Sequence, residues 1–202
     1  AEARAAAARV AEDEVLRRAE ADGELRLAEV GPDAACGEAL AAMLACPVGA
    51  YREAVEALGG MFASIAGEPQ EARLRVIRAG NSGFQESLGR RPGVWLFLRG
   101  AGFEPLAREA LPAGLLASIG LGPGPPSERF LLLREPDMMG EYETWLAWHE
   151  RLRSIAGFLG SLAELALRRS AHLGQAGLDV PAQGLLRASE VVQRWEACRG
   201  GG

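Results

Sequence analysis

The chain has 202 residues, enough for one domain with its own buried core, and its 49% hydrophobic and 24% charged residues are typical of a globular protein. A formal net charge of −5 argues against nucleic acid as the main partner, and because all 22 basic residues are Arg, Schiff-base chemistry on Lys and a Lys-based phosphate loop are excluded. Cys36, Cys46 and Cys198 follow no zinc or redox spacing and fit a reducing, cytoplasmic setting. The apolar runs are too short to cross a bilayer, so we expect no membrane insertion, and the start without Met indicates a segment of a longer protein.

The N-terminal third of the chain predicts three helices. Residues 1–31 mix Ala with interleaved Glu and Arg, which favours a solvated helix ending at Gly31-Pro32. A short apolar helix is predicted over 38–46, and a third begins at Pro47. Apolar residues recur in the third helix at spacings of three and four, which predicts one buried face made of Tyr51, Val55, Leu58, Phe62 and Ile65.

The next segment predicts a helix beginning at Pro69, because proline suits the first turn of a helix. Leu74 and Ile77 would form the buried stripe of that helix. Gly80-Asn81 would end it in a left-handed conformation. Ser82 would then cap the following helix, in a capping box with the glutamine three residues later.

The middle of the chain changes in texture. Residues 94–99 predict a short helix, the glycine- and proline-rich residues 120–126 predict a turn-rich connection, and RFLLLRE at 129–135 predicts a strand. A strand needs a partner, and residues 115–119 are the candidate for it.

The C-terminal part predicts a long helix over residues 141–171. Its apolar positions form a heptad-like seam of Trp145, Trp148, Leu152, Ile155, Leu159, Leu162 and Ala166. This seam fits packing on its own domain or self-association with a second copy. Residues 181–196 predict one more short helix.

No catalytic or metal-binding constellation emerges from the residue types and their spacing. Ser82 lies in Gly-Asn-Ser-Gly, which lacks the G-x-S-x-G elbow, and both histidines, His149 and His172, fall in the C-terminal part. His149-Glu150 lacks the second His of a zinc-protease helix. We therefore expect a non-enzymatic segment without catalytic residues, metal or cofactor.

One ordered run of residues resembles a known family. The pattern P-x-E-x-x-x-R-x-I-R-x-x-N-x-x-F is formed by Pro69, Glu71, Arg75, Ile77, Arg78, Asn81 and Phe84, and Gly102-Phe103-Glu104 follows about eighteen residues later. This run resembles the PUB domain of peptide N-glycanases and UBX-containing proteins. The resemblance covers residues 38–136, about half of the chain.

The resemblance implies an α+β fold that is predominantly helical, with a small antiparallel sheet, flanked here by helices in 1–31 and 141–198. The family docks the acidic C-terminal tail of the hexameric AAA ATPase valosin-containing protein, and some members take an internal peptide of a deubiquitinase or its adaptor. The segment would then be an adaptor in ubiquitin-dependent protein degradation. The implied peptide-binding residues are Ser64, Leu74, Arg75, Arg78, Asn81, Gly102 and Phe103, where Ser64 and Leu74 stand at positions at which the family often has Asn and Tyr.

Simple chemistry agrees with this implication, because a short acidic peptide ending in an aromatic residue needs arginine forks, an amide and an apolar slot. Three alternatives stay open. In the first alternative, Arg75 and Arg78 only pair with Glu71 or Glu86 on a solvated face, and Asn81 only caps the end of a helix. The segment is the adaptor portion of a larger enzyme, an N-glycanase or ubiquitin ligase. It is a helical scaffold that self-associates through residues 145–166.

Overall fold

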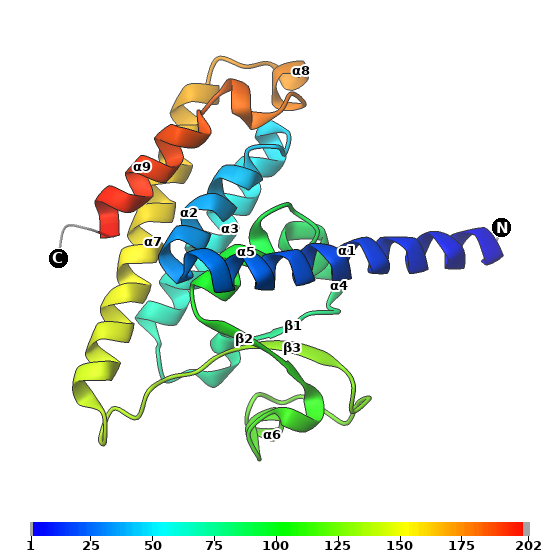
Figure 1. The fold of residues 1–202 in the computed structure, drawn as a ribbon, viewed down its shortest axis with the longest axis vertical. Helices are drawn as coiled ribbons and strands as arrows, with labels where there is room; N and C mark the ends of the chain where they lie inside the picture. The colour runs from blue at the N-terminus through cyan, green and yellow to red at the C-terminus, as the bar shows by residue number, and fades with distance from the viewer. Residues whose placement is uncertain (1, 200–202) are drawn as a thin grey trace.

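The structure is a computed structural model that describes the backbone of residues 2–199 and the side chains of residue 14 and residues 17–199. Its fold is α+β and predominantly helical with a three-stranded antiparallel sheet, which confirms the predicted class. The helices are α1 (Glu2–Val30), α2 (Pro32–Met43), α3 (Val48–Gly67), α4 (Ser82–Phe84), α5 (Val94–Gly100), α6 (Leu115–Ser118), α7 (Tyr142–Ser170), α8 (Gln175–Leu178) and α9 (Ala188–Arg199). The strands are β1 (Val76–Arg78), β2 (Phe103–Ala107) and β3 (Arg129–Leu133), and short helical turns occupy Ala72–Arg75 (η1), Gln85–Gly89 (η2), Arg108–Ala110 (η3) and Ala182–Gly184 (η4). Figure 1 shows α2, α3, α7 and α9 on one side of the molecule and the sheet with α6 on the other.

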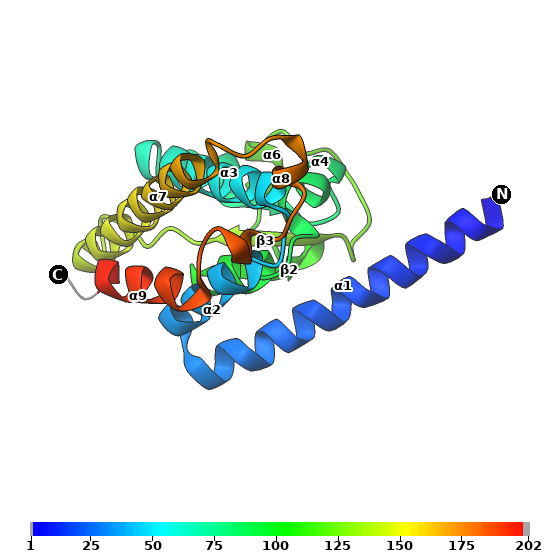
Figure 2. The ribbon, with the colours of Figure 1, turned by 90° about the horizontal axis from the view of Figure 1, so that it is seen from above.

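Helix α1 leaves the body of the protein toward its N-terminus, as Figure 2 shows. Its C-terminal turns are not fully solvated, because they pack on α5. Gly23 is buried against the Trp95 indole, where a β-carbon would lie 3.2 Å from Trp95 Cδ1. The Glu24 carboxylate accepts hydrogen bonds from Trp95 Nε1 at 3.2 Å and from Arg99 Nη2 at 2.9 Å. The predicted solvated helix therefore has one anchored end.

Helix α3 forms the centre of the main core. All five apolar residues predicted to share its buried face are fully buried: Tyr51, Val55, Leu58, Phe62 and Ile65. The Phe62 ring makes edge-to-face contacts with Phe97 of α5 and Phe103 of β2, at centroid distances of 5.9 and 6.1 Å. This helix thus joins the helical side of the molecule to the sheet.

The predicted seam of α7 packs on α3 within the same chain. Leu152, Ile155 and Leu159 are at most 1% exposed, and Gly59 of α3 lets the two helices approach closely, since a β-carbon there would lie 3.4 Å from Leu159 Cβ. The prediction of packing on its own domain is confirmed. Self-association through these three side chains would need an exposed surface that they do not offer.

Segment 141–198, expected as a flanking extension, contributes to the same core as residues 38–136. Trp195 of α9 is 1% exposed, contacts Phe97 and Phe158 edge to face, and donates its indole N–H to Asp33 O at 2.7 Å. The two segments therefore share one apolar interior.

The sheet has the order β1-β3-β2, with both neighbouring pairs antiparallel. The central strand β3 is the predicted RFLLLRE strand. Its Leu131 and Leu133 face the main core, while Phe130 and Leu132 belong to a smaller apolar cluster with Leu111. A strand buried on both faces is apolar throughout instead of alternating, and this explains its run of hydrophobic residues.

Two predictions about the sheet are wrong. Residues 115–118 form helix α6 instead of a partner strand, and Leu115 and Leu116 pack on the smaller apolar cluster. The helix predicted from Pro69 is instead the short turn η1 followed by strand β1. The β-branched Val76 and Ile77 pair with Leu132 and Leu131 of β3, so tertiary pairing overrides the local helical signal.

The junction after β1 also differs from its prediction. Neither Gly80 nor Asn81 has a positive φ, so neither is a left-handed helix end. Asn81 is instead the N-cap of α4, where its side-chain oxygen accepts a hydrogen bond from Phe84 N at 3.0 Å, and Ser82 is the first helical residue. The Gln85 amide donates to Ala79 O at 2.6 Å and closes the turn.

Among the described residues, no helix combines the length and the hydropathy that crossing a membrane requires.

Candidate functional site

Arg75, at the end of η1, is committed to contacts within the protein. Its guanidinium donates to Leu133 O at 3.2 Å and to Glu135 Oε2 at 2.9 Å, and its side chain is only 12% exposed. Burial lowers the pKa of Arg75, an effect that the charge of Glu135 opposes. Glu135 also accepts a hydrogen bond from Trp145 Nε1 at 3.0 Å, so Arg75 ties the sheet to the start of α7.

Arg78, the last residue of β1, is the exposed member of a charged network. Its Nε donates to Glu128, whose other oxygen accepts from Arg108 Nε at 2.8 Å and Nη2 at 2.5 Å. The hydrogen bonds from Arg108 and then Arg78 hold the pKa of Glu128 below its ordinary value, against the opposing effect of desolvation. The Arg78 side chain keeps 49% of its surface exposed, whereas Arg108 and Glu128 keep 10% each.

One alternative expected these two arginines to pair with Glu71 or Glu86, and that expectation is wrong. Glu71 instead accepts a hydrogen bond from the Arg73 side chain at 3.1 Å. The partners of Arg75 and Arg78, Glu135 and Glu128, flank the neighbouring strand β3 and lie 60 and 50 residues along the chain. Such long-range pairs could not be read from helical spacing.

The other proposed peptide-binding residues have mostly structural contacts. The Ser64 hydroxyl donates to Gly60 O at 2.9 Å near the exposed C-terminal end of α3. Leu74 is half-buried against the core, and Asn81 caps α4. Phe103 is fully buried, and Gly102 before it has a φ of 108°, a conformation that favours glycine.

The sheet register decides which of these residues lie together. Arg75 precedes Val76, which pairs with Leu132, and Phe103 pairs with Leu133, so Arg75 and the Gly102-Phe103 corner flank the same end of β3. Arg78 pairs with Phe130 at the opposite end. The structure therefore places Arg75 near Phe103 and separates Arg78 from both.

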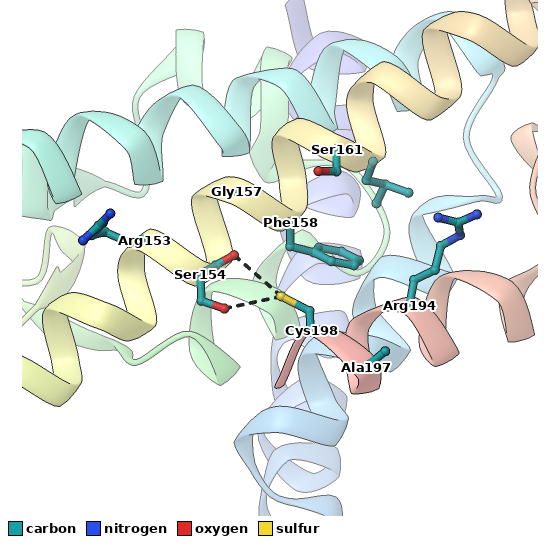
Figure 3. A pocket seen from close by; sticks show the side chains of 9 residues that line it. Arg153, Ser154, Gly157, Phe158, Ser161, Arg194, Ala197 and Cys198 are labelled. Atoms are coloured by element: carbon teal, nitrogen blue, oxygen red, sulfur yellow. Dashed lines mark hydrogen bonds between the residues drawn. The ribbon is translucent and has the colours of Figure 1, made fainter. Parts of the chain in front are cut away.

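A second candidate surface, which the sequence did not indicate, is a cleft of about 620 Å³ between α7 and α9. Figure 3 shows Phe158 within it, flanked by Ser154 and Cys198. The Cys198 sulfur lies 3.4 Å from Ser154 Oγ. Arg153 and Arg194 stand at its rim, and Arg194 is already paired with Glu190 at 3.2 Å. The exposed Gly157 has no side chain to fill this part of the cleft. Its role can be recognised in the sequence only once α9 is known to be the partner helix.

The residues considered for catalysis have other contacts. His149 shares a hydrogen bond of 2.8 Å with Ala66 O and stacks on Trp145 at 5.0 Å. Burial raises the pKa of Cys36 to about 12 and also raises that of Cys46, so both thiols stay protonated at neutral pH. Within the described residues, no three His, Cys, Asp or Glu side chains gather as metal ligands.

Comparisons of the chain with protein-family models, with curated proteins and with solved structures find no match.

Proposed function

We propose that this segment is a protein-interaction module that captures a short acidic peptide at the exposed edge of β1, with no catalysis of its own. The candidate peptide is the C-terminal tail of the AAA ATPase valosin-containing protein, which would make the segment an adaptor in cytoplasmic, ubiquitin-dependent degradation. The resemblance of residues 38–136 to the PUB domain, which the motif run from Pro69 to Glu104 carries, supports the choice of peptide. A helical domain with a small antiparallel sheet fits what that resemblance implies.

The observation that carries the proposal is the position of Arg78. It ends a strand that pairs on one side only, because β1 is an edge of the sheet. Its hydrogen bond to Glu128 uses Nε, so in the described part of the chain both Nη groups are left for a carboxylate of the peptide. An edge strand can also add backbone hydrogen bonds to an extended peptide.

The rest of the surface divides into supporting and binding parts. Arg75 positions the end of the sheet through Leu133 and Glu135, so it acts mainly on the shape of the site. Phe103 is fully buried, so we assign the apolar contact for an aromatic residue of the peptide to the half-buried Leu74. Ser64 offers a hydroxyl at the exposed end of α3.

A fluorescence polarisation titration with the labelled tail peptide tests this proposal. The Arg78→Glu variant should bind at least about tenfold more weakly, because a charge-assisted hydrogen bond is lost and a like charge is introduced. Arg78→Gln should show a smaller loss. Arg168→Glu is the matched control, since Arg168 lies exposed on α7 in a pair with Glu164 and should leave the affinity unchanged.

Thermal unfolding of each variant shows whether a loss of affinity reflects binding or the loss of the Glu128 network. Equal affinity of the parent and both Arg78 variants would rule out this edge as the peptide site.

A further inference from the structure

A second cleft, of about 550 Å³, lies where α3 ends and α7 begins. Its walls include Glu68, Pro69 and Glu71 from the turn after α3, Met138 from the connection into α7, and Trp145 from the first turn of α7. These two parts of the chain are distant in sequence. The cleft therefore exists only in the folded protein.

The charge of this cleft is negative. Glu68 and Glu71 line it, and among the described residues no basic side chain does. Glu71 already accepts a guanidinium, that of Arg73, at 3.1 Å. The exposed Glu68 forms no side-chain hydrogen bond or ion pair within residues 17–199, so its carboxylate can accept a partner.

The connection that carries Met138 extends the same charge. Residues 135–145 contain no basic residue and four carboxylates, of which Glu135 is paired with Arg75 and three carry no such pair in the part of the chain that the structure describes: Asp137, Glu141 and Glu143. Asp137 accepts a hydrogen bond from Met139 N at 3.0 Å, which shapes the turn. A cationic ligand would meet attraction from both walls of the cleft.

The Trp145 indole is an aromatic wall held in one orientation. Its Nε1 donates to Glu135, and its ring stacks on His149 with an interplanar angle of 18°. Such a ring can accept the aliphatic stem or the cationic head of a basic side chain without losing rotamer freedom of its own.

Two exposed apolar side chains lie in the chain between the cleft residues Met138 and Trp145. Met139, in the turn before α7, is 88% exposed, and Tyr142, the first residue of α7, is 56% exposed. Large apolar side chains exposed next to a charged cleft mark interaction surfaces, and Met adapts its shape to a partner.

We propose that this cleft binds an arginine-containing peptide segment of a partner protein. The guanidinium meets Glu68 and Glu71, the aliphatic stem packs on Trp145 and Met138, and neighbouring apolar residues of the peptide contact Met139 and Tyr142. Its lining does not include Arg78, Leu74 or Ser64, and its charge is opposite to that of Arg78. The segment would thereby hold two peptides of different chemistry.

The test uses the whole chain and two synthetic peptides, Gly-Arg-Leu-Arg-Gly-amide and Gly-Glu-Leu-Glu-Gly-amide. Proton–nitrogen NMR spectra follow the indole N–H of Trp145, assigned with the Trp145→Phe variant. The arginine peptide should shift this signal and the Glu68 and Glu71 amides saturably, and the glutamate peptide should not.

The Glu68→Gln variant should bind the arginine peptide about three- to fivefold more weakly, the scale of one exposed ion pair. Glu56→Gln, the same change of charge at an exposed position of α3, is the matched control and should bind like the parent. Arg78→Glu should also retain arginine-peptide binding. No saturable shift at Trp145, or an equal loss in Glu68→Gln and Glu56→Gln, would overturn the proposal.

Discussion

The helical side and the sheet side of this protein are stabilised in different ways. On the helical side, α2, α3, α7 and α9 bury aliphatic and aromatic side chains such as Phe62 and Trp195, and the ion pairs of that side are more exposed, as in Arg169–Glu190, whose side chains are 37% and 26% exposed. On the sheet side, the largely buried Arg75 and Arg108 pair with Glu135 and Glu128, and the exposed Arg78 joins the second pair. Apolar burial supplies stability without direction, whereas charged hydrogen bonds fix side chains in defined positions. The surface offered for peptide binding lies on the side that is held by directional contacts.

The largest expected effect concerns the helical side. Phe62→Ala should lower the free energy of unfolding by about 3 to 5 kcal/mol, because it removes a fully buried ring and leaves a cavity between Phe97 and Phe103. Urea unfolding followed by circular dichroism measures it. Glu56→Ala on the exposed face of α3 should stay within about 0.5 kcal/mol of the parent. A loss for Phe62→Ala as small as that of the control would contradict the role of α3 in joining the two sides.

A smaller effect that depends on pH is expected on the sheet side. Glu128→Gln should reduce stability at neutral pH, because Arg78 and Arg108 lose their shared carboxylate. The folded protein holds the pKa of Glu128 below its ordinary value of 4.5, so the carboxylate contributes stability above that pH. This contribution is lost as the pH falls from 4.5 through the lower pKa of the folded state.

The stability difference between the parent and Glu128→Gln should accordingly narrow below pH 4.5, and it should shrink with added salt. Urea titrations at several pH values measure it. Glu164→Gln, which breaks an exposed pair within α7, serves as the control with little effect at any pH. A difference that stays constant across this range would show that the carboxylate charge is not what stabilises the sheet side.

The smallest expected effect concerns the reactivity of the cysteines. It tests whether the buried thiols of the helical side stay inaccessible when the sheet side is destabilised. Iodoacetamide at pH 8 should modify the exposed Cys198 and spare Cys36 and Cys46, since burial raises the pKa of both thiols, that of Cys36 to about 12. Mass spectrometry should find one modification in the native protein and three in urea. Cys198→Ser should take up none in the native state.

The same pattern is expected in Glu128→Gln, because Cys36 of α2 is buried against α5, where its thiol contacts Phe97 O at 3.7 Å. Rapid modification of Cys36 in that variant would show that the packing of the helical side depends on the charged network of the sheet side.

The helices were predicted better than the sheet. The period of Tyr51, Val55 and Leu58 depends only on which side chains lie on one face of a helix, so local sequence was sufficient. Strand β1 and helix α6 were assigned incorrectly because a three-residue strand and a four-residue helix carry too little local pattern. Their secondary structure depends on which segment pairs with β3 and which segment covers the outer face of β3.

The candidate sites divide in the same manner. Arg75 and Arg78 were visible in the sequence as part of the run that resembles the PUB domain. Their partners Glu135 and Glu128 were not, since antiparallel pairing brings them from 60 and 50 residues away. Neither the cleft between α7 and α9 nor the acidic cleft at Trp145 has a motif, because each is formed by two segments that meet only in the fold.

By itself, the sequence determined the helical class, the buried faces of α3 and α7 and the apolar central strand, because each follows from a short-range period of hydrophobic residues. The tertiary structure alone decided that residues 141–198 share the core of residues 38–136, that Arg75 supports the sheet and that Arg78 stays exposed at its edge. These outcomes depend on contacts between residues far apart in the chain. A one-dimensional pattern does not encode which distant carboxylate or apolar face will arrive beside a given side chain.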